Sequence, residues 1–240
     1  MDSSLNAAEH RPAHMAPLSG TLEPDSHWPT SAAPAKPLDV QTTSAAFYTT
    51  SAVAGFCMMG LEILAGPLLE PAFGKGNDVW AGIISVFILS LSVGYLLGGR
   101  LADRVPTRMA LGIVLTAAGL IYCLLPLYAW DMIDVLVANI PRMRVGALIA
   151  SMGLFFLPSL LLGMVSPMLV KLVFKCLEEL GRTTGVIYAV AAVGNVLGVL
   201  VTNFVFVDLV GVANTLVAMG VALVIVGVGH LANGMMQPAE

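Results

Sequence analysis

The sequence has few charged residues for its length, and this shortage excludes an ordinary soluble domain. Asp, Glu, Lys and Arg make up only 11% of the 240 residues, whereas 58% are hydrophobic and the mean hydropathy is +0.88. A soluble domain usually carries about 25% charged residues to cover its surface. The net charge of -4 also lacks the basic excess of a nucleic-acid-binding protein. We therefore expect the lipid bilayer, and no nucleic acid, as the main partner of this surface.

The sequence also lacks the patterns that hold metals or cofactors. Its cysteines stand alone, and no CxxC pair or other metal-ligand spacing occurs among Cys57, Cys123 and Cys176. Three of the four histidines precede the first apolar run, and the apolar runs offer no paired nucleophile and base. We therefore predict no metal, no cofactor and no catalytic residues, so that the chain is not an enzyme.

No long apolar run occurs in the first 45 residues, which are rich in Pro, Ser, Ala and Thr. A secretory signal needs an apolar stretch within about the first 15 to 30 residues, so we expect no signal here. The composition of residues 1–45 is typical of a disordered polar tail. At the other end, residues 234–240 are expected to form a short tail.

From Ala46 onward, apolar runs recur that are long enough to cross a bilayer, which takes about 20 helical residues. They predict an all-α integral membrane domain over residues 46–233 with about six transmembrane helices. The expected helices span residues 46–71, 79–101, 108–129, 145–172, 184–208 and 211–233. Two stretches, Asp131 to Arg144 and Lys171 to Arg182, are predicted to be short amphipathic connectors.

The distribution of Lys and Arg among the connections predicts the orientation of these helices. The connections after the second and fourth helices hold six such residues, and those on the opposite side hold three. Cytoplasmic connections of membrane proteins are enriched in Lys and Arg. We therefore expect both termini to be cytoplasmic.

A single constant shift along the chain suggests an internal repeat. It superposes Pro67 on Pro167, Gly94 on Gly194, and Gly98 on Gly198. Helices one, two and three then correspond to helices four, five and six, and an odd number of helices gives the two halves opposite orientations. We interpret the match as a 3+3 inverted repeat, as found in many transporters. Since glycines four positions apart also let helices approach closely, packing is the expected role of all four glycines.

The first predicted helix carries two carboxylates, Glu62 and Glu70, in an otherwise apolar run. A carboxylate at bilayer depth is costly and normally faces a protein interior or a water-filled cavity. Glu62 is therefore the first candidate for a proton or cation site, with a structural hydrogen bond to a neighbouring helix as the alternative. Glu70 is expected at the membrane interface. Asn195 is a second polar candidate, whose amide needs a partner that is by default a neighbouring helix.

Three prolines are predicted to interrupt membrane helices, because proline removes a backbone donor. Pro67 lies in the first helix, and Pro158 and Pro167 lie in the fourth. Paired interruptions in the two halves of a membrane protein indicate a central binding site. Structural kinks without a ligand are the alternative.

The connection Gly98-Gly-Arg-Leu-Ala-Asp103-Arg104 resembles the Gly-x-x-x-Asp-Arg loop between the second and third helices of the major facilitator superfamily. In that superfamily the acid and the base hold helix ends together and help to set the conformational equilibrium. The resemblance implies a gating or bracing role for Asp103 and Arg104. A solvated loop is the alternative.

Taken in order, the segments resemble the membrane part of bacterial proteins in which a facilitator-like domain is fused to a spermidine-synthase-like domain. The resemblance covers most of residues 50–211. It rests on Phe73-Gly74, Ser90-Leu-Ser-Val-Gly94-Tyr-Leu-Leu-Gly-Gly-Arg-Leu-Ala-Asp-Arg104, Leu157-Pro-Ser-Leu-Leu-Leu-Gly-Met-Val-Ser-Pro-Met-Leu-Val-Lys171 and Gly181-Arg-Thr-Thr-Gly-Val-Ile-Tyr188. It implies a multi-pass protein of the bacterial inner (cytoplasmic) membrane. The aminopropyltransferase-like domain that usually follows in that family is not expected in this chain.

These features favour a transporter-like unit that moves a small organic solute or a cation, such as a polyamine, past Glu62. Such a unit would work as a homodimer of six-helix halves. The alternative is a noncatalytic membrane subunit that anchors or assists a separately encoded enzyme or a larger membrane complex. The repeat, the intramembrane carboxylate and the facilitator-like loop favour transport, whereas the shortage of other intramembrane charges favours the alternative.

Overall fold

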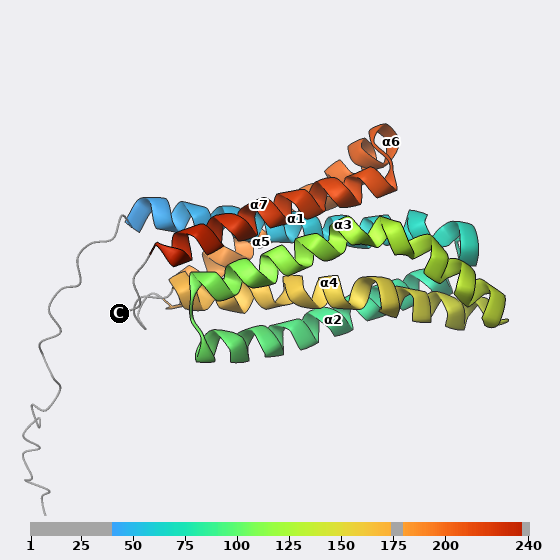
Figure 1. Cartoon of the computed structure of the whole chain (residues 1–240), viewed down its shortest axis with the longest axis horizontal. Coiled ribbons are helices and arrows are strands. Elements are labelled where there is room, and N and C mark those ends of the chain that lie inside the picture. Colours follow the sequence, from blue (N-terminus) through green and yellow to red (C-terminus); the bar gives the residue numbers. More distant parts are fainter. Residues whose placement is uncertain (1–39, 174–179, 237–240) are drawn as a thin grey trace, which may run out of the picture. The chain divides into compact units, whose positions relative to one another are not determined.

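A computed structural model describes residues 40–173 and 180–236 of the chain (Figure 1). The predicted disordered tail lies outside the described residues except for residues 40–45, which already belong to the first helix. The predicted C-terminal tail lies outside them from residue 237 onward, and its first two residues still belong to the last helix. The predicted connector from Lys171 to Arg182 also falls partly outside the description.

The described residues form helices and no strands. The elements are α1 (Val40–Phe73), α2 (Asn77–Arg104), α3 (Arg108–Asn139), α4 (Met143–Val173), α5 (Leu180–Val201), the π-helical segment η2 (Thr202–Phe206), α6 (Val207–Leu209) and α7 (Val212–Met235). Six spans are long and apolar enough to cross a membrane, and α5, η2 and α6 together make one of them. The six predicted spans are therefore confirmed.

Short polar or glycine-containing sequences separate the helices. Gly74 after α1 and Gly211 before α7 have φ angles of 80° and 83°, a backbone conformation that favours glycine. Thr107 caps α3, because its hydroxyl accepts a hydrogen bond of 3.1 Å from the amide of Ala110. Residues 140–142 alone connect α3 to α4.

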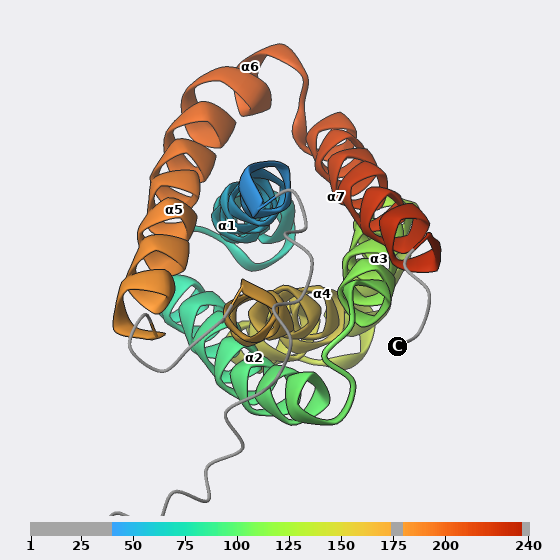
Figure 2. The ribbon, with the colours of Figure 1, turned by 90° about the vertical axis from the view of Figure 1, so that its left-hand side faces the viewer.

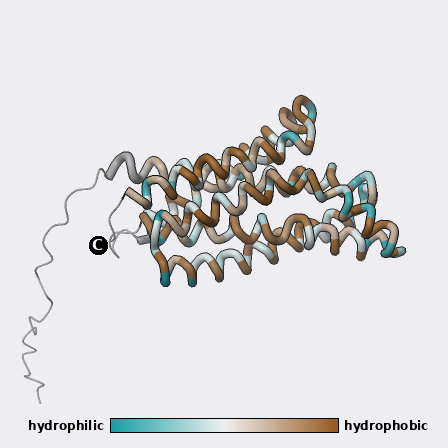
Figure 3. The backbone as a smooth tube through the Cα atoms, in the orientation of Figure 1, coloured by the Kyte–Doolittle hydropathy of each residue, from teal (hydrophilic) through white to brown (hydrophobic). Residues whose placement is uncertain are grey.

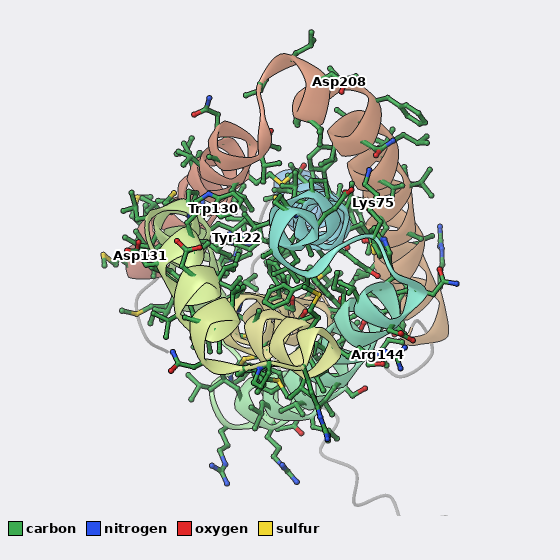
Figure 4. The ribbon with its side chains drawn as sticks, turned by 90° about the vertical axis from the view of Figure 1, so that its right-hand side faces the viewer. Lys75, Tyr122, Trp130, Asp131, Arg144 and Asp208 are labelled. Atoms are coloured by element: carbon green, nitrogen blue, oxygen red, sulfur yellow. The ribbon has the colours of Figure 1, made fainter. Side chains whose placement is uncertain are left out.

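This short connection corrects one prediction. Asp131 to Arg144 was expected to be an amphipathic connector, but α3 continues to Asn139. The acidic residues Asp131 and Asp134 are exposed at the end of a helix whose other face stays apolar, so they extend it beyond the apolar run. Figure 4 shows Trp130 and Asp131 on the outside of α3.

The predicted interruptions at prolines are also not seen. Both α1 and α4 remain α-helical through their internal prolines, Pro67 and Pro71 in α1 and Pro158 and Pro167 in α4. A proline removes one backbone hydrogen bond. In apolar, tightly packed surroundings no water competes for the remaining backbone groups, and those bonds keep the helix continuous.

Three helix pairs make the most extensive contacts: α1 with α5, α2 with α4, and α3 with α7. Figure 2 looks along the helices and shows α1 between α5 and α7, and α4 between α2 and α3. The central helices α1 and α4 are the most buried of the six spans. We call the end where α1 begins and α7 ends the near end, and the end that holds α6 the far end (Figure 1).

Apolar residues run along the length of the helices, and polar residues gather at the two ends (Figure 3). Large apolar side chains are exposed along the outer helices, for example Ile88 on α2, Leu127 on α3 and Ile225 on α7. A soluble protein of this size rarely exposes so much apolar surface. These properties define a multi-pass membrane protein whose outer surface contacts lipid.

Candidate functional site

A cavity of about 230 Å³ lies between α1, α2, α4 and α5. Much of its wall is aliphatic, but polar side chains reach it from all four helices: Ser51 on α1, Tyr95 on α2, Ser166 on α4, and Tyr188 and Asn195 on α5. Because polar groups are rare inside this bundle, we take this cavity as the candidate site, the polar pocket.

A close approach of α5 to α1 brings Asn195 into the polar pocket. Gly55 makes this approach possible, because a Cβ built on it would touch the backbone of Ala191 and lie 2.8 Å from Oδ1 of Asn195. At the next turn the hydroxyl of Ser51 donates a hydrogen bond of 2.9 Å to the carbonyl of Ile187. Asn195, predicted as a polar candidate, therefore lines the cavity beside the α1 backbone.

Most polar side chains of the pocket are available for a ligand. Within the described part of the chain, no hydrogen bond joins the side chain of Tyr95, Ser166, Tyr188 or Asn195 to another group. All four side chains are at least partly exposed, so a molecule or water that enters the cavity can reach them. The two tyrosines are 44% and 46% exposed, so the pocket opens sideways along α2 and α5.

Glu62 lies half-buried on α1, one turn beyond the pocket toward the far end. It follows the pocket residues Met58 and Met59 by four and three positions, a spacing that places side chains on the same helix face. One turn further, Gly66 packs against the ring of Trp80 on α2. Glu62 is therefore beside the pocket and on its face of α1, although it does not line the cavity itself.

No described residue forms an ion pair or a side-chain hydrogen bond with Glu62. Glu70, two turns further along α1, differs, because its carboxylate pairs with Lys75 at 2.5 Å. The far end also holds an exposed ion pair of 2.7 Å between Asp78 and Arg144. Figure 4 looks at this end and shows Lys75 in the connection between α1 and α2, Arg144 at the start of α4 and Asp208 on α6. Glu62 is thus the unpaired carboxylate of α1.

The two residues of the facilitator-like connection do not pair with each other. The carboxylate of Asp103 at the end of α2 accepts a hydrogen bond of 2.9 Å from Nζ of Lys171 at the end of α4. Arg104 makes no ion pair with a described residue. Lys171 was missed as the partner, because Asp103 and Lys171 are far apart in the sequence and only the packing of α2 on α4 brings them together. The contact lies outside the polar pocket.

The prolines and glycines singled out in the sequence lie in the walls between helices and do not line the polar pocket. Pro158 is buried, Pro67 and Pro167 are half-buried, and Pro167 lies against Gly98. Gly94 and Gly98 meet the α4 backbone, while Gly194 and Gly198 meet the α1 backbone. Gly194 also lines a second, apolar cavity. These positions bring helices together and do not present polar groups.

The second cavity is larger, about 660 Å³, and lies between α1, α5, η2 and α7. Its wall is apolar and includes many small residues, with Ala52, Ala189, Gly194, Ala218 and Ala222 among them. We call it the apolar groove. It offers no charged group and no side-chain hydroxyl or amide, so it suits a hydrocarbon surface.

Sequence reasoning missed two polar features. His230 on α7 is buried, lies 2.8 Å from the hydroxyl of Thr50 on α1, and stacks on Phe47. The isolated histidine in the last apolar run was the available signal. The π-helical segment η2 was also missed, and it contains Asn203. Such segments often mark functional positions, but sequence patterns do not identify them.

Comparisons with known proteins add no family assignment. No protein-family model, no curated protein and no solved structure matches the chain. The class of the protein therefore follows from its own geometry: it is a polytopic, all-helical membrane protein with a polar pocket between α1, α2, α4 and α5.

Proposed function

We propose that the chain is a six-helix transporter unit, built as a 3+3 inverted repeat, that carries a small organic solute or cation through the polar pocket. The repeat would relate α1, α2 and α3 to α4, α5 and α7. The observation that carries the proposal is a correspondence between contacts in the two halves, and on this correspondence the pocket would lie where the repeats meet.

The first support is the glycine contacts of the pairs α1–α5 and α2–α4. Gly55 on α1 meets Ala191 on α5, and Gly163 on α4 meets Leu91 on α2. Likewise, Gly194 and Gly198 of α5 meet Ala52 and Phe56 of α1, while Gly94 and Gly98 of α2 meet Leu160 and Met164 of α4. Each of these three contacts of one pair becomes a contact of the other when α1 is superposed on α4 with Gly55 on Gly163, and α2 on α5 with Gly94 on Gly194.

The third pair supports the same operation. A Cβ built on Gly112 of α3 would lie 2.7 Å from the carbonyl oxygen of Gly227 on α7, and one on Gly220 would lie 2.7 Å from that of Gly119. The shift that places Gly55 on Gly163 also places Gly112 on Gly220 and Gly119 on Gly227, so it exchanges these two contacts. The pair α3–α7 therefore maps onto itself, as expected for helices beside a two-fold axis in the membrane plane.

These contacts change the register that the sequence suggested. The uniform shift that superposes Gly94 on Gly194 suits α2 and α5 but not α1 and α4, where a longer shift is needed. Pro67 and Pro167 are then no longer equivalent, and Pro167 corresponds to Met59 instead. The prolines matched by coincidence of spacing, whereas the glycines match by what they touch.

The second support is the position of the polar pocket. With the revised register, Met58 corresponds to Ser166 and Tyr95 corresponds to Asn195, and all four line the cavity. The cavity thus lies where the two repeats meet. Substrate sites of transporters with inverted repeats are typically found at this interface.

The resemblance to facilitator-type proteins leads us to propose that two copies form the working transporter. The polar pocket opens sideways past the half-exposed Tyr95 and Tyr188. A second copy on this face would close the pocket and remove these side chains from lipid. We further propose a bacterial inner membrane location with cytoplasmic termini, and polyamines as the first solutes to screen.

The test is uptake by the purified chain reconstituted into liposomes. Asn195→Leu should lower the initial uptake rate of a transported solute about tenfold or more, because it replaces a pocket amide by a bulky apolar group. Asn214→Leu is the matched control, since Asn214 is exposed on α7 and its side chain bonds only to the carbonyl of Val210, just before that helix. Equal uptake by the wild type and Asn195→Leu, or no uptake of any solute screened, would contradict the proposal.

The apolar groove favours a second candidate, a noncatalytic membrane subunit. Small side chains let a partner's helix approach closely in lipid, and the groove is lined by alanines and a glycine. Native mass measurement in mild detergent separates the two functions. A homodimer without other chains supports the transporter, and a stoichiometric foreign subunit supports the accessory role.

A further inference from the structure

The charges around the polar pocket limit what can bind there. The described lysines and arginines all lie within about one turn of a helix end or in a connection: Lys75, Arg100, Arg104, Arg108, Arg142, Arg144, Lys171 and Arg182. None of them pairs with Glu62. The carboxylate of Glu62 therefore has no fixed counter-charge from the described part of the protein.

An unpaired carboxylate at membrane depth is disfavoured even when it is half-buried, as Glu62 is. Two ways of neutralising it are available: the carboxylate can take up one proton, or it can pair with one positive charge on a bound ligand. Both use the same oxygen atoms, so the two states exclude each other.

The side chains that line the pocket add no fixed charge that would neutralise Glu62. Among the side chains that line the pocket, the titratable groups are Tyr95 from α2 and Tyr188 from α5, and tyrosine carries no charge at neutral pH. The pocket residues of α4 are apolar apart from the hydroxyl of Ser166. On α1 itself, the next carboxylate, Glu70, is already paired with Lys75. Glu62, one helix turn beyond the pocket wall, is thus the one unpaired negative charge of α1 beside the pocket.

We propose that Glu62 binds one proton or one monovalent organic cation in strict alternation, so that transport exchanges one cation for one proton. This proposal rests on the proposed function and specifies its substrate class. The aromatic faces of Tyr95 and Tyr188 and the thioethers of Met58 and Met59 complement an organic ammonium group better than a small hydrated ion. The single carboxylate of Glu62 favours a ligand that carries one positive charge.

The same argument disfavours polyamines, which the family resemblance implied. Spermidine carries several ammonium groups at neutral pH, and a single carboxylate neutralises one of them. The other ammonium groups would remain in the membrane interior without a counter-charge, and burying an unpaired charge costs much free energy. A polyamine should therefore bind the pocket more weakly than a monoamine of similar size.

The experiment is calorimetric titration of the full chain in lipid nanodiscs with benzyltrimethylammonium, in two buffers that differ in ionisation enthalpy. Over the pH range in which Glu62 is protonated, the affinity should rise with pH by up to about tenfold per unit, with up to one proton released per cation bound. Spermidine should bind at least about tenfold more weakly. Glu62→Gln should lose both proton release and most of the affinity, whereas Glu70→Gln is the control that should retain both.

A second variant keeps the test informative if Glu62→Gln folds poorly. Glu62→Asp preserves the charge on a shorter side chain, so it should bind the probe more weakly but still release about one proton. Probe binding without proton release, tighter binding of spermidine, or no binding to the wild type overturns the exchange proposal. Uptake of an uncharged solute that Asn195→Leu abolishes would leave the proposed function standing while refuting this inference.

Discussion

The helix pairs α1–α5 and α2–α4 have the same packing but different chemistry. Each pair is held by three glycines that meet the backbone of the facing helix at matching positions. In the proposed register, however, Glu62 of α1 corresponds to Val170 of α4, and Met58 of α1 corresponds to Ser166 of α4. If the proposed repeat holds, both halves share the close packing, whereas at this position one of them carries a carboxylate.

The largest expected effect comes from the shared packing. Gly94→Leu and Gly194→Leu should each lower the free energy of unfolding by about 3 kcal/mol, because a side chain has no room against the facing backbone. Gly99→Leu and Gly185→Leu are controls on the same helices, since no atom lies within 4 Å of a Cβ built at either position. The measurement is thermal unfolding in detergent, and unchanged melting of the first two variants would show that the matched contacts are not structural.

Moving the carboxylate between the halves tests their chemical difference. Glu62→Val should weaken benzyltrimethylammonium binding at least about tenfold, or about 1.4 kcal/mol. Adding Val170→Glu should restore part of the binding, because residue 170 is the half-buried equivalent one turn beyond Ser166. Titration calorimetry of the single and double variants measures this. Failure of the double variant, with its fold intact, would contradict the revised register.

The hydrogen bond between α7 and α1 should have a smaller effect. His230→Leu removes the contact of 2.8 Å with Thr50, and we expect a loss of about 1 kcal/mol in the free energy of unfolding. Tyr122→Phe, which removes a bond of 2.9 Å from α3 to the carbonyl of Cys57, should cost a similar amount. Thermal unfolding of the two variants is the measurement. A loss confined to one of them would show that α1 is held mainly from one side.

The smallest effect is expected at the near end. Asp103→Asn breaks the ion pair with Lys171, but both side chains are largely exposed, so the loss should stay below about 0.5 kcal/mol and vanish at high salt. In the proposed repeat, Asp103 of α2 corresponds to Asn203 of η2. Asp103→Asn would therefore make these two positions identical. Thermal unfolding at low and high salt checks this, and a large loss would mean that the pair does more than join two helix ends.

Sequence reasoning predicted the six helices because long apolar runs have few alternatives in a bilayer. It ended the third helix too early, because Asp131 and Asp134 suggested a connector. In the structure the apolar residues between them pack, and α3 continues. Glu62 and Asn195 were found because polar groups are conspicuous in apolar helices. Their relation to Tyr95, Tyr188 and Ser166 was not predictable, because the pocket forms from four helices whose contacts depend on register.

The proposed repeat uses a register that differs from the uniform shift, and the difference has a physical reason. A one-dimensional shift assumes equal connection lengths in both halves, but Gly55 and Gly94 are farther apart in the chain than Gly163 and Gly194. Pro67 and Pro167 satisfy the uniform shift but are not equivalent in the proposed register. What a glycine touches depends on three-dimensional contact, and the proposed register rests on those contacts.

The contact between α3 and α7 has a property usually associated with pairs of separate molecules. The contact of Gly112 on α3 with Gly227 on α7 recurs, with the two helices exchanging roles, as the contact of Gly220 on α7 with Gly119 on α3. This reciprocity is that of an isologous dimer interface, in which one surface is complementary to itself. A three-helix segment bearing this surface, inserted into the membrane in both orientations, would already carry what it needs to bind its own inverted copy.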